Sequence, residues 1–95
     1  MNVPFQVDLK DKVAVVTGGG GILCSVMAEA LAACGARVAV LDLRKPAADK
    51  VAEKIRAQGG QASGFECNVL ELASIQAANT AIEAAFGPVD ILVNG

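Results

Sequence analysis

The 95-residue sequence contains no histidine, tryptophan or tyrosine, and only three phenylalanines and three cysteines. Without histidine, and with Cys24, Cys34 and Cys67 at no metal-ligand spacing, the sequence argues against a zinc site. An odd number of cysteines also argues against a disulfide framework. We therefore expect no metal site, reduced thiols and a cytoplasmic protein.

The chain has little excess of either charge and no segment typical of a membrane anchor. Eight basic and ten acidic residues are mixed along it, which argues against nucleic acid or a membrane surface as partner. The start, MNVPFQVDLKDK, lacks the apolar core of a signal peptide. The apolar stretch 22–41 has the length of a membrane span, but Glu29, Gly35 and Arg37 interrupt it, and its pattern divides into a helix and a strand.

Aliphatic residues, in contrast, are abundant: 54% of the sequence is hydrophobic and only 3% is aromatic. Such a composition is typical of an α/β core built from Val, Ile, Leu and Ala. Short apolar runs predict strands at about 13–17, 37–42, 61–66 and 89–94, and helical periodicity predicts helices at about 22–35, 46–58 and 71–86. The third strand is more polar, as an edge strand can be.

The alternation βαβαβαβ predicts one domain over residues 1–95, with a parallel sheet and right-handed crossovers. In the first helix, one apolar stripe is expected to face the sheet, formed by Val26, Met27, Ala30, Leu31 and Cys34. Gly35 is expected at the end of that helix, where a left-handed conformation is needed.

Four consecutive glycines, residues 18–21, separate the first strand from the first helix. Glycine loses the most backbone freedom on folding, so such a run is expected where the backbone approaches something closely. Free N–H groups in the loop and the first helical turn, with the helix dipole, suit a diphosphate. We expect it to be bound by Gly18, Gly20, Gly21, Ile22 and Leu23. A flexible turn without a ligand is the alternative for the glycines alone.

The second strand ends on Asp42, where a carboxylate can accept hydrogen bonds from the ribose hydroxyls of an adenosine. The alternative is an ordinary aspartate in a turn. A carboxylate at this place repels a 2′-phosphate and so favours NAD over NADP. Arg44 and Lys45 follow closely. Their positive charges keep NADP as an alternative cofactor. If they are solvated loop charges instead, they have no role in choosing the cofactor.

In four motifs the chain resembles the short-chain dehydrogenase/reductase family, over residues 9–95. TGGGG followed by LAACGA is similar to the family's glycine loop and the helix after it, and LDL to the ribose-binding end of its second strand. CNVLE is similar to its segment after the third strand, and VDILVNG to its fourth-strand motif. The form GGGGILCS is also similar, more distantly, to a subgroup that contains D-mannonate oxidoreductases.

The resemblance implies a Rossmann-type three-layer α/β/α fold, of which this chain would be the N-terminal part. The strand order would be 3-2-1-4, with the first two helices on one face and the third on the other. The cofactor would be NAD, with Asn68 and the Val69 N–H at the adenine and Asn94 beside the nicotinamide ribose. A turn or helix cap is the alternative for Asn68, and a polar strand end is the alternative for Thr17 and Asn94.

The sequence also departs from the family pattern. The family's second and third glycines fall on Ile22 and Cys24, and Gly95 replaces the second asparagine of the fourth-strand motif. We expect Gly21 to serve in place of the second glycine. Cys24 is expected to be a small side chain at a close contact between helix and strand.

The family transfers a hydride with a tyrosine, a lysine four residues later and a serine, and this sequence contains no tyrosine. We therefore expect no catalytic residue here, and interpret the chain as the cofactor-binding part of a longer NAD-dependent oxidoreductase. That protein would act on a hydroxyl/carbonyl pair, for example in a sugar acid, and would be a homo-oligomer.

Two alternatives stay open: a non-catalytic dinucleotide-binding module, and a methyltransferase that uses S-adenosylmethionine. The second would need an acidic residue before the glycines, where the sequence has VVT. By themselves, the 95 residues are expected to be poorly soluble or molten, because the fourth strand would form an open apolar edge.

Overall fold

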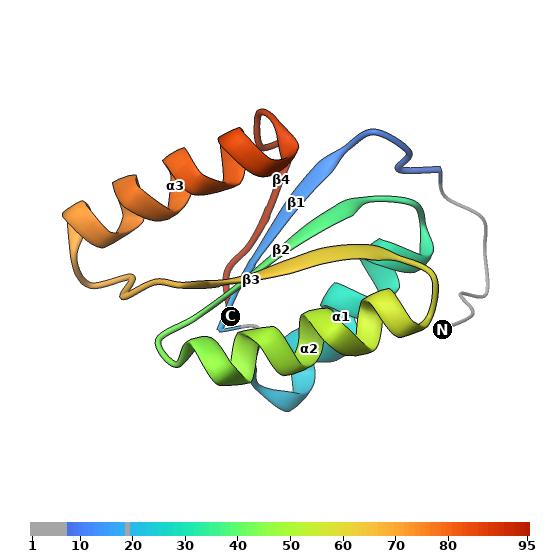
Figure 1. Cartoon of the computed structure of the whole chain (residues 1–95), viewed down its shortest axis with the longest axis horizontal. Coiled ribbons are helices and arrows are strands. Elements are labelled where there is room, and N and C mark those ends of the chain that lie inside the picture. Colours follow the sequence, from blue (N-terminus) through green and yellow to red (C-terminus); the bar gives the residue numbers. More distant parts are fainter. Residues whose placement is uncertain (1–7, 19) are drawn as a thin grey trace.

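The computed structural model describes residues 8–18 and 20–95, in which strands and helices alternate (Figure 1). Two parts of the chain lie outside the described residues: Gly19, in the glycine run, and residues 1–7, in the N-terminal segment that lacks the apolar core of a signal peptide. The elements are β1 (Val13–Thr17), α1 (Ile22–Ala33), β2 (Arg37–Asp42), α2 (Lys45–Ala57), β3 (Gln61–Glu66), α3 (Leu72–Phe86) and β4 (Ile91–Val93).

The strands form one parallel sheet in the order β3-β2-β1-β4, which confirms the predicted topology. β1 lies inside the sheet and all five of its residues are buried, as an uninterrupted run of small and β-branched residues requires. The more polar β3 lies at an edge, as its sequence predicted. Thr17 pairs with Leu41 and Val16 with Val93, so the carboxyl ends of β1, β2 and β4 meet at one edge of the sheet.

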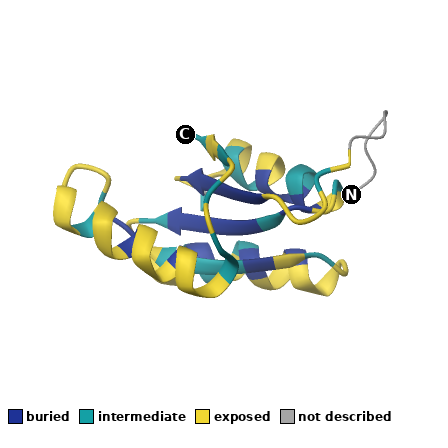
Figure 2. Cartoon of the chain, turned by 90° about the horizontal axis from the view of Figure 1, so that it is seen from above, coloured by how far each residue is buried: buried dark blue, intermediate teal, exposed yellow. Residues whose placement is uncertain are grey.

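Helices cover both faces of the sheet, α1 and α2 on one and α3 on the other (Figure 1). Alternation along β1 divides its side chains between the two layers: Ala14 and Val16 pack with α1 and α2, whereas Val13 and Val15 pack with α3. Burial is greatest in these central strands, and the helices expose their outer faces (Figure 2). The three-layer α/β/α arrangement is thereby confirmed.

The face that α1 turns to the sheet matches the predicted stripe only in part. Leu31 packs against the core as expected. Ala28 and Ala32, however, are the buried residues of this face, whereas Val26 is 43% and Met27 39% exposed. Alanines let the helix axis approach the sheet closely, and larger side chains at these positions would hold it away. Because α1 is apolar on nearly every side, hydrophobic periodicity alone does not distinguish this face. No helix within the described ranges is long and apolar enough to cross a membrane.

Helix ends differ from the expected bounds by one or two residues. α1 ends at Ala33, not at 35, and Gly35 takes the left-handed φ of +102° in the turn that follows. α2 begins at Lys45, one residue before the expected start, so that Pro46 lies in its first turn, where a missing N–H costs nothing. α3 begins at Leu72, with Glu71 as its N-cap.

β4 is shorter than the expected strand 89–94 and covers only Ile91–Val93. Asp90 lies before the ladder because it bonds both backbone groups of Val13 in another way. Its Oδ2 accepts a hydrogen bond from the Val13 N–H at 2.9 Å, and its own N–H donates to the Val13 carbonyl at 2.9 Å. At the end of β4, the Val93 carbonyl and the Gly95 N–H are both hydrogen-bonded to the side-chain hydroxyl of Thr17.

Candidate functional site

The predicted site residues converge at the edge where the parallel strands end. Gly18 follows β1, Asp42 ends β2 and Asn94 follows β4, and the register aligns these three ends. In open α/β sheets, ligands bind outside the carboxyl ends of the strands, close to where the strand order reverses. Here the reversal lies at β1, which has β2 on one side and β4 on the other.

The glycine loop turns tightly into α1. Gly18 has a φ of +64°, a conformation that L side chains rarely adopt, and the Gly21 N–H closes the turn on the Gly18 carbonyl at 3.0 Å. Gly21 is the N-cap of α1. Among the described residues, none accepts a hydrogen bond from the Ile22 or Leu23 N–H. These N–H groups at a helix N-terminus have the geometry and partial charge that bind an anion.

The carboxylate of Asp42 joins the end of β2 to the glycine loop. Its Oδ2 accepts a hydrogen bond from the Gly20 N–H at 3.0 Å, and its Oδ1 accepts one from the Arg44 N–H at 3.0 Å. The second bond is that of an aspartate in a turn, so the structure contains the alternative role as well. Each oxygen keeps a further lone pair for a hydroxyl donor.

Gly20 has no space for a side chain. A Cβ built on it would lie 2.6 Å from Asp42 Oδ2 and 2.8 Å from the Ala47 Cβ. The loop therefore packs directly against the end of β2 and the first turn of α2. This close approach explains one glycine of the run without any ligand.

Asn68 lies in the turn between β3 and α3, and its side chain is used within that turn. Its Oδ1 accepts a hydrogen bond from the Leu70 N–H at 3.0 Å, and its Nδ2 donates to Glu71 Oε1 at 3.2 Å. The Cys67 N–H donates to the Asp42 carbonyl at 3.0 Å, so this turn lies next to the end of β2. The turn alternative for Asn68 is present, and the Val69 side chain is exposed.

At the end of β4, the buried Thr17 hydroxyl bridges two strands. It donates a hydrogen bond to the Val93 carbonyl at 3.3 Å and accepts one from the Gly95 N–H at 3.0 Å. Cys24, in the first turn of α1, packs against the core. It is a small side chain at a contact between helix and strand, as expected. A Cβ on Gly95 would collide with the Cys24 sulfur. Two of the departures from the family pattern, Cys24 and Gly95, therefore meet in space.

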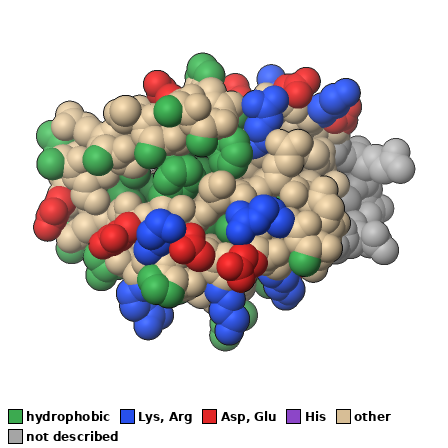
Figure 3. All heavy atoms as spheres, in the orientation of Figure 1, with side chains coloured by type: hydrophobic (Ala, Val, Ile, Leu, Met, Phe, Trp, Pro, Cys, Tyr) green, Lys and Arg blue, Asp and Glu red, His purple; other side chains and the backbone are tan. Residues whose placement is uncertain are grey.

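An apolar pocket that the sequence did not predict lies between α3 and the sheet. It has a volume of about 460 Å³, and its wall includes Thr17 and Asn94 at the carboxyl edge. Hydrophobic side chains gather in this region of the surface (Figure 3). A signal in the sequence is the apolar side of α3, where Ile75 stays 41% exposed. The apolar residues that line the pocket come from several elements: Leu41, Cys67, Val69, Ile75, Ile82 and Leu92.

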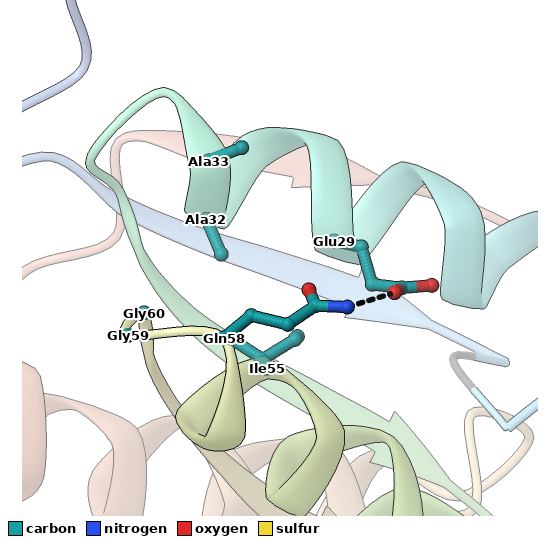
Figure 4. A pocket seen from close by; sticks show the side chains of 7 residues that line it. All are labelled: Glu29, Ala32, Ala33, Ile55, Gln58, Gly59 and Gly60. Atoms are coloured by element: carbon teal, nitrogen blue, oxygen red, sulfur yellow. Dashed lines mark hydrogen bonds between the residues drawn. The ribbon is translucent and has the colours of Figure 1, made fainter. Parts of the chain in front are cut away.

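A second pocket of about 300 Å³ lies between α1 and α2, at the opposite end of the sheet (Figure 4). Glu29 is only 6% exposed there, and its Oε1 accepts a hydrogen bond from Gln58 Nε2 at 3.3 Å and lies 3.4 Å from Lys54 Nζ. These contacts join the two helices and do not reach the glycine loop. In the part of the chain that the structure describes, no three His, Cys, Asp or Glu residues lie close enough to hold a metal ion.

Comparison with known proteins gives consistent matches. Residues 12–95 match the model of the short chain dehydrogenase family. An uncharacterized oxidoreductase of Haemophilus influenzae is 46% identical over 95 residues, which are 100% of this chain and 33% of that protein. D-Threitol dehydrogenase of Mycolicibacterium smegmatis is 42% identical over 94 residues, 99% of this chain and 36% of that protein.

Solved structures that are similar to this chain also belong to dehydrogenases and oxidoreductases. The crystal structure of a proposed D-mannonate oxidoreductase from Haemophilus influenzae, with bound NAD, is 47% identical, with a TM-score of 0.87 over 90% of this chain and 30% of that one. A hydroxysteroid dehydrogenase from Escherichia coli is 34% identical, with a TM-score of 0.89 over 92% of this chain and 37% of that one. The chain spans about a third of the length of the curated relatives it matches.

Proposed function

The chain belongs to the short-chain dehydrogenase/reductase family, and from this premise we propose that it binds NAD as the N-terminal cofactor-binding part of an oxidoreductase. The observation that supports this most directly is the contact between Asp42 and Gly20. It brings a carboxylate suited to a ribose diol next to N–H groups suited to a diphosphate. The two groups are adjacent in an adenosine diphosphate, and the residues present therefore fit the cofactor.

In this proposal the diphosphate lies on the loop formed by Gly18, Gly20 and Gly21 and on the N–H groups of Ile22 and Leu23. The adenosine ribose binds Asp42. The adenine lies at Asn68 and Val69, over the apolar pocket beside them. Asn68 Oδ1 accepts one hydrogen bond within its turn and keeps a second lone pair for the adenine amino group. Asn94, exposed after β4, lies beside the nicotinamide ribose.

Bound NAD supplies the hydride acceptor, and these residues of the chain hold and orient it. The sequence has no tyrosine, so the proposal assigns the tyrosine, lysine and serine of the family's chemistry to residues outside this chain. The substrate would be a hydroxyl/carbonyl pair on a polyol or sugar acid. This is supported by the names of two relatives, a D-threitol dehydrogenase and a proposed D-mannonate oxidoreductase. We also propose a cytoplasmic homo-oligomer.

Calorimetric titration of NAD and NADH into the protein at its natural length tests the binding. Saturable heat with one site per chain is expected, and its absence at millimolar ligand would contradict the proposal. Oxidation of polyols and sugar acids, followed by NADH absorbance, then separates an oxidoreductase from a non-catalytic module. Binding of NAD without any turnover would favour the module. The methyltransferase alternative disagrees with the family match.

A further inference from the structure

Two basic residues follow the proposed ribose-binding carboxylate, at the point where NAD and NADP differ. Arg44 and Lys45 line a pocket of about 500 Å³ at the start of α2, together with Leu43, Pro46, Ala47 and Glu66. The Arg44 N–H is bonded to Asp42 itself. A free ammonium group in this pocket would attract the 2′-phosphate of NADP, because it would compensate the negative charge of Asp42.

Lys45, however, is engaged elsewhere. Its Nζ lies 3.0 Å from Asp49 Oδ1 and 2.9 Å from Asp49 Oδ2, one helical turn further along α2. Both oxygens of the carboxylate are used, so the ammonium is held against the helix. Ion pairs of this spacing are usually weak when both partners move freely in solvent.

Asp49, unlike a fully exposed acid, is packed closely against the edge strand β3. A Cβ built on Gly64 would collide with Asp49 Oδ1 and would lie 2.7 Å from the Asp49 backbone nitrogen. The absence of a side chain at Gly64 therefore makes the space that the Asp49 carboxylate occupies. The side chains of Lys45 and Asp49 are 54% and 40% exposed. The strand thereby limits, on one side, the positions open to the carboxylate to which Lys45 is bound.

We infer that Asp49 is a positioning residue for cofactor specificity: it withholds the Lys45 ammonium from the ribose, so that Arg44 is left as the basic residue of this pocket and the preference of Asp42 for NAD over NADP is strengthened. The inference rests on the proposed function. Asp49 acts through Lys45 and touches no part of the cofactor. The signature of this role is a change in the ratio of the NADP and NAD affinities, because a merely structural residue would lower both affinities together.

The test measures dissociation constants for NAD and for NADP in the protein at its natural length, by calorimetry at low ionic strength. In Asp49→Asn, which keeps the shape of the side chain and removes its charge, NADP is expected to bind about threefold to tenfold more tightly, because one ammonium is released toward a phosphate. The NAD affinity should change by less than about twofold. Restoring the charge with Asp49→Glu should return the ratio toward that of the unmodified protein.

Three further variants identify the cause. Lys45→Ala should leave the ratio unchanged in the unmodified background, because Lys45 is already withheld, and should abolish the gain in the Asp49→Asn background. Glu53→Gln is the matched control. It removes an exposed acid one turn further along α2, with no described bond to Lys45, and should leave the ratio unchanged.

An unchanged ratio in Asp49→Asn overturns the inference, as does an equal gain in Glu53→Gln, which would indicate a general effect of charge. A gain that persists without Lys45 also overturns it. If the unmodified protein binds neither nucleotide, the proposed function fails and the inference fails with it. If NAD binds and only the ratio fails to respond, the inference fails alone. Circular dichroism shows whether each variant is folded. Should Asp49→Asn unfold, Asp49→Ser, which also removes the charge, takes its place, with the same expected gain and the same result overturning the inference.

Discussion

Asp42 Oδ2 accepts a hydrogen bond from the Gly20 N–H at 3.0 Å, and this bond ties the end of β2 to the loop after β1. The contact joins two features that are 22 positions apart in the sequence. Neither feature alone distinguishes a nucleotide site from an ordinary turn. Together they define a surface with a carboxylate on one side and helix N–H groups on the other, which is the charge pattern of a ribose next to a diphosphate.

Replacing Asp42 with alanine should weaken NAD binding about tenfold or more, because hydrogen bonds to a charged group contribute about 1.5–3 kcal/mol. The NADP affinity should fall less, since the repulsion of a 2′-phosphate is removed at the same time. Calorimetry on both nucleotides measures this. Asp90→Ala is the matched control. That carboxylate also accepts a backbone hydrogen bond, but from Val13, at the amino-terminal ends of the strands. It should reduce stability and leave the NAD affinity unchanged; an equal loss of affinity in both variants would remove Asp42 from the site.

Gly20→Ala should reduce NAD affinity about tenfold or more, because the new Cβ would lie 2.6 Å from Asp42 Oδ2 and force the loop or the carboxylate to move. Gly60→Ala offers a comparable crowding away from the site, with its Cβ 2.8 Å from Ile55 Cγ2. That control should lower the melting temperature without altering NAD affinity in the folded protein. Normal NAD binding by Gly20→Ala would show that the close approach has no part in binding.

Thr17→Val should destabilise the fold by about 1–3 kcal/mol, because two part-buried hydrogen bonds are lost: the Gly95 N–H loses its acceptor and the Val93 carbonyl loses its donor. Thr17→Ser keeps the hydroxyl and removes one methyl group, which should cost about 1 kcal/mol or less. Urea denaturation measures both. If the two variants lose the same stability, the methyl group, and not the hydroxyl bridge, is what matters at this position.

Residues 1–95 expressed alone should bind the dye ANS and show poorly dispersed amide NMR signals. The reason is the apolar pocket beside α3, where Ile75 is 41% and Leu92 59% exposed. Leu92→Asn should reduce the dye fluorescence. Leu43→Asn is the control, since Leu43 is 62% exposed but lies outside this pocket. A sharp, reversible two-state melt with no dye binding would refute the expectation.

The topology was predictable because each strand is a short apolar run and each helix has turn residues at its end. The parallel order 3-2-1-4 then follows from right-handed crossovers. The convergence of Gly20 and Asp42 was predictable for the same reason, since both follow strands whose carboxyl ends must meet at one edge. The bounds of β4 were not, because Val89 has the apolar character of a strand residue and nothing in the sequence indicates that Asp90 bonds Val13.

Other features depend on contacts between elements that a linear pattern does not contain. The face of α1 could not be chosen from periodicity, because Val26 and Met27 are as apolar as the buried Ala28 and Ala32. The bond between Lys45 and Asp49 has ordinary helical spacing. The close approach of Asp49 to Gly64 is not visible in that spacing, since only the packing of α2 on β3 brings that glycine to Asp49.

The alternation of side chains along β1 makes neighbouring residues reporters of different halves of the protein. Val15 packs in the layer of α3, whereas Val16 packs in the layer of α1 and α2. Isotope labels on the methyl groups of these two valines would follow each layer separately through unfolding. If one layer melts before the other, two consecutive positions would lose their native chemical shifts at different denaturant concentrations.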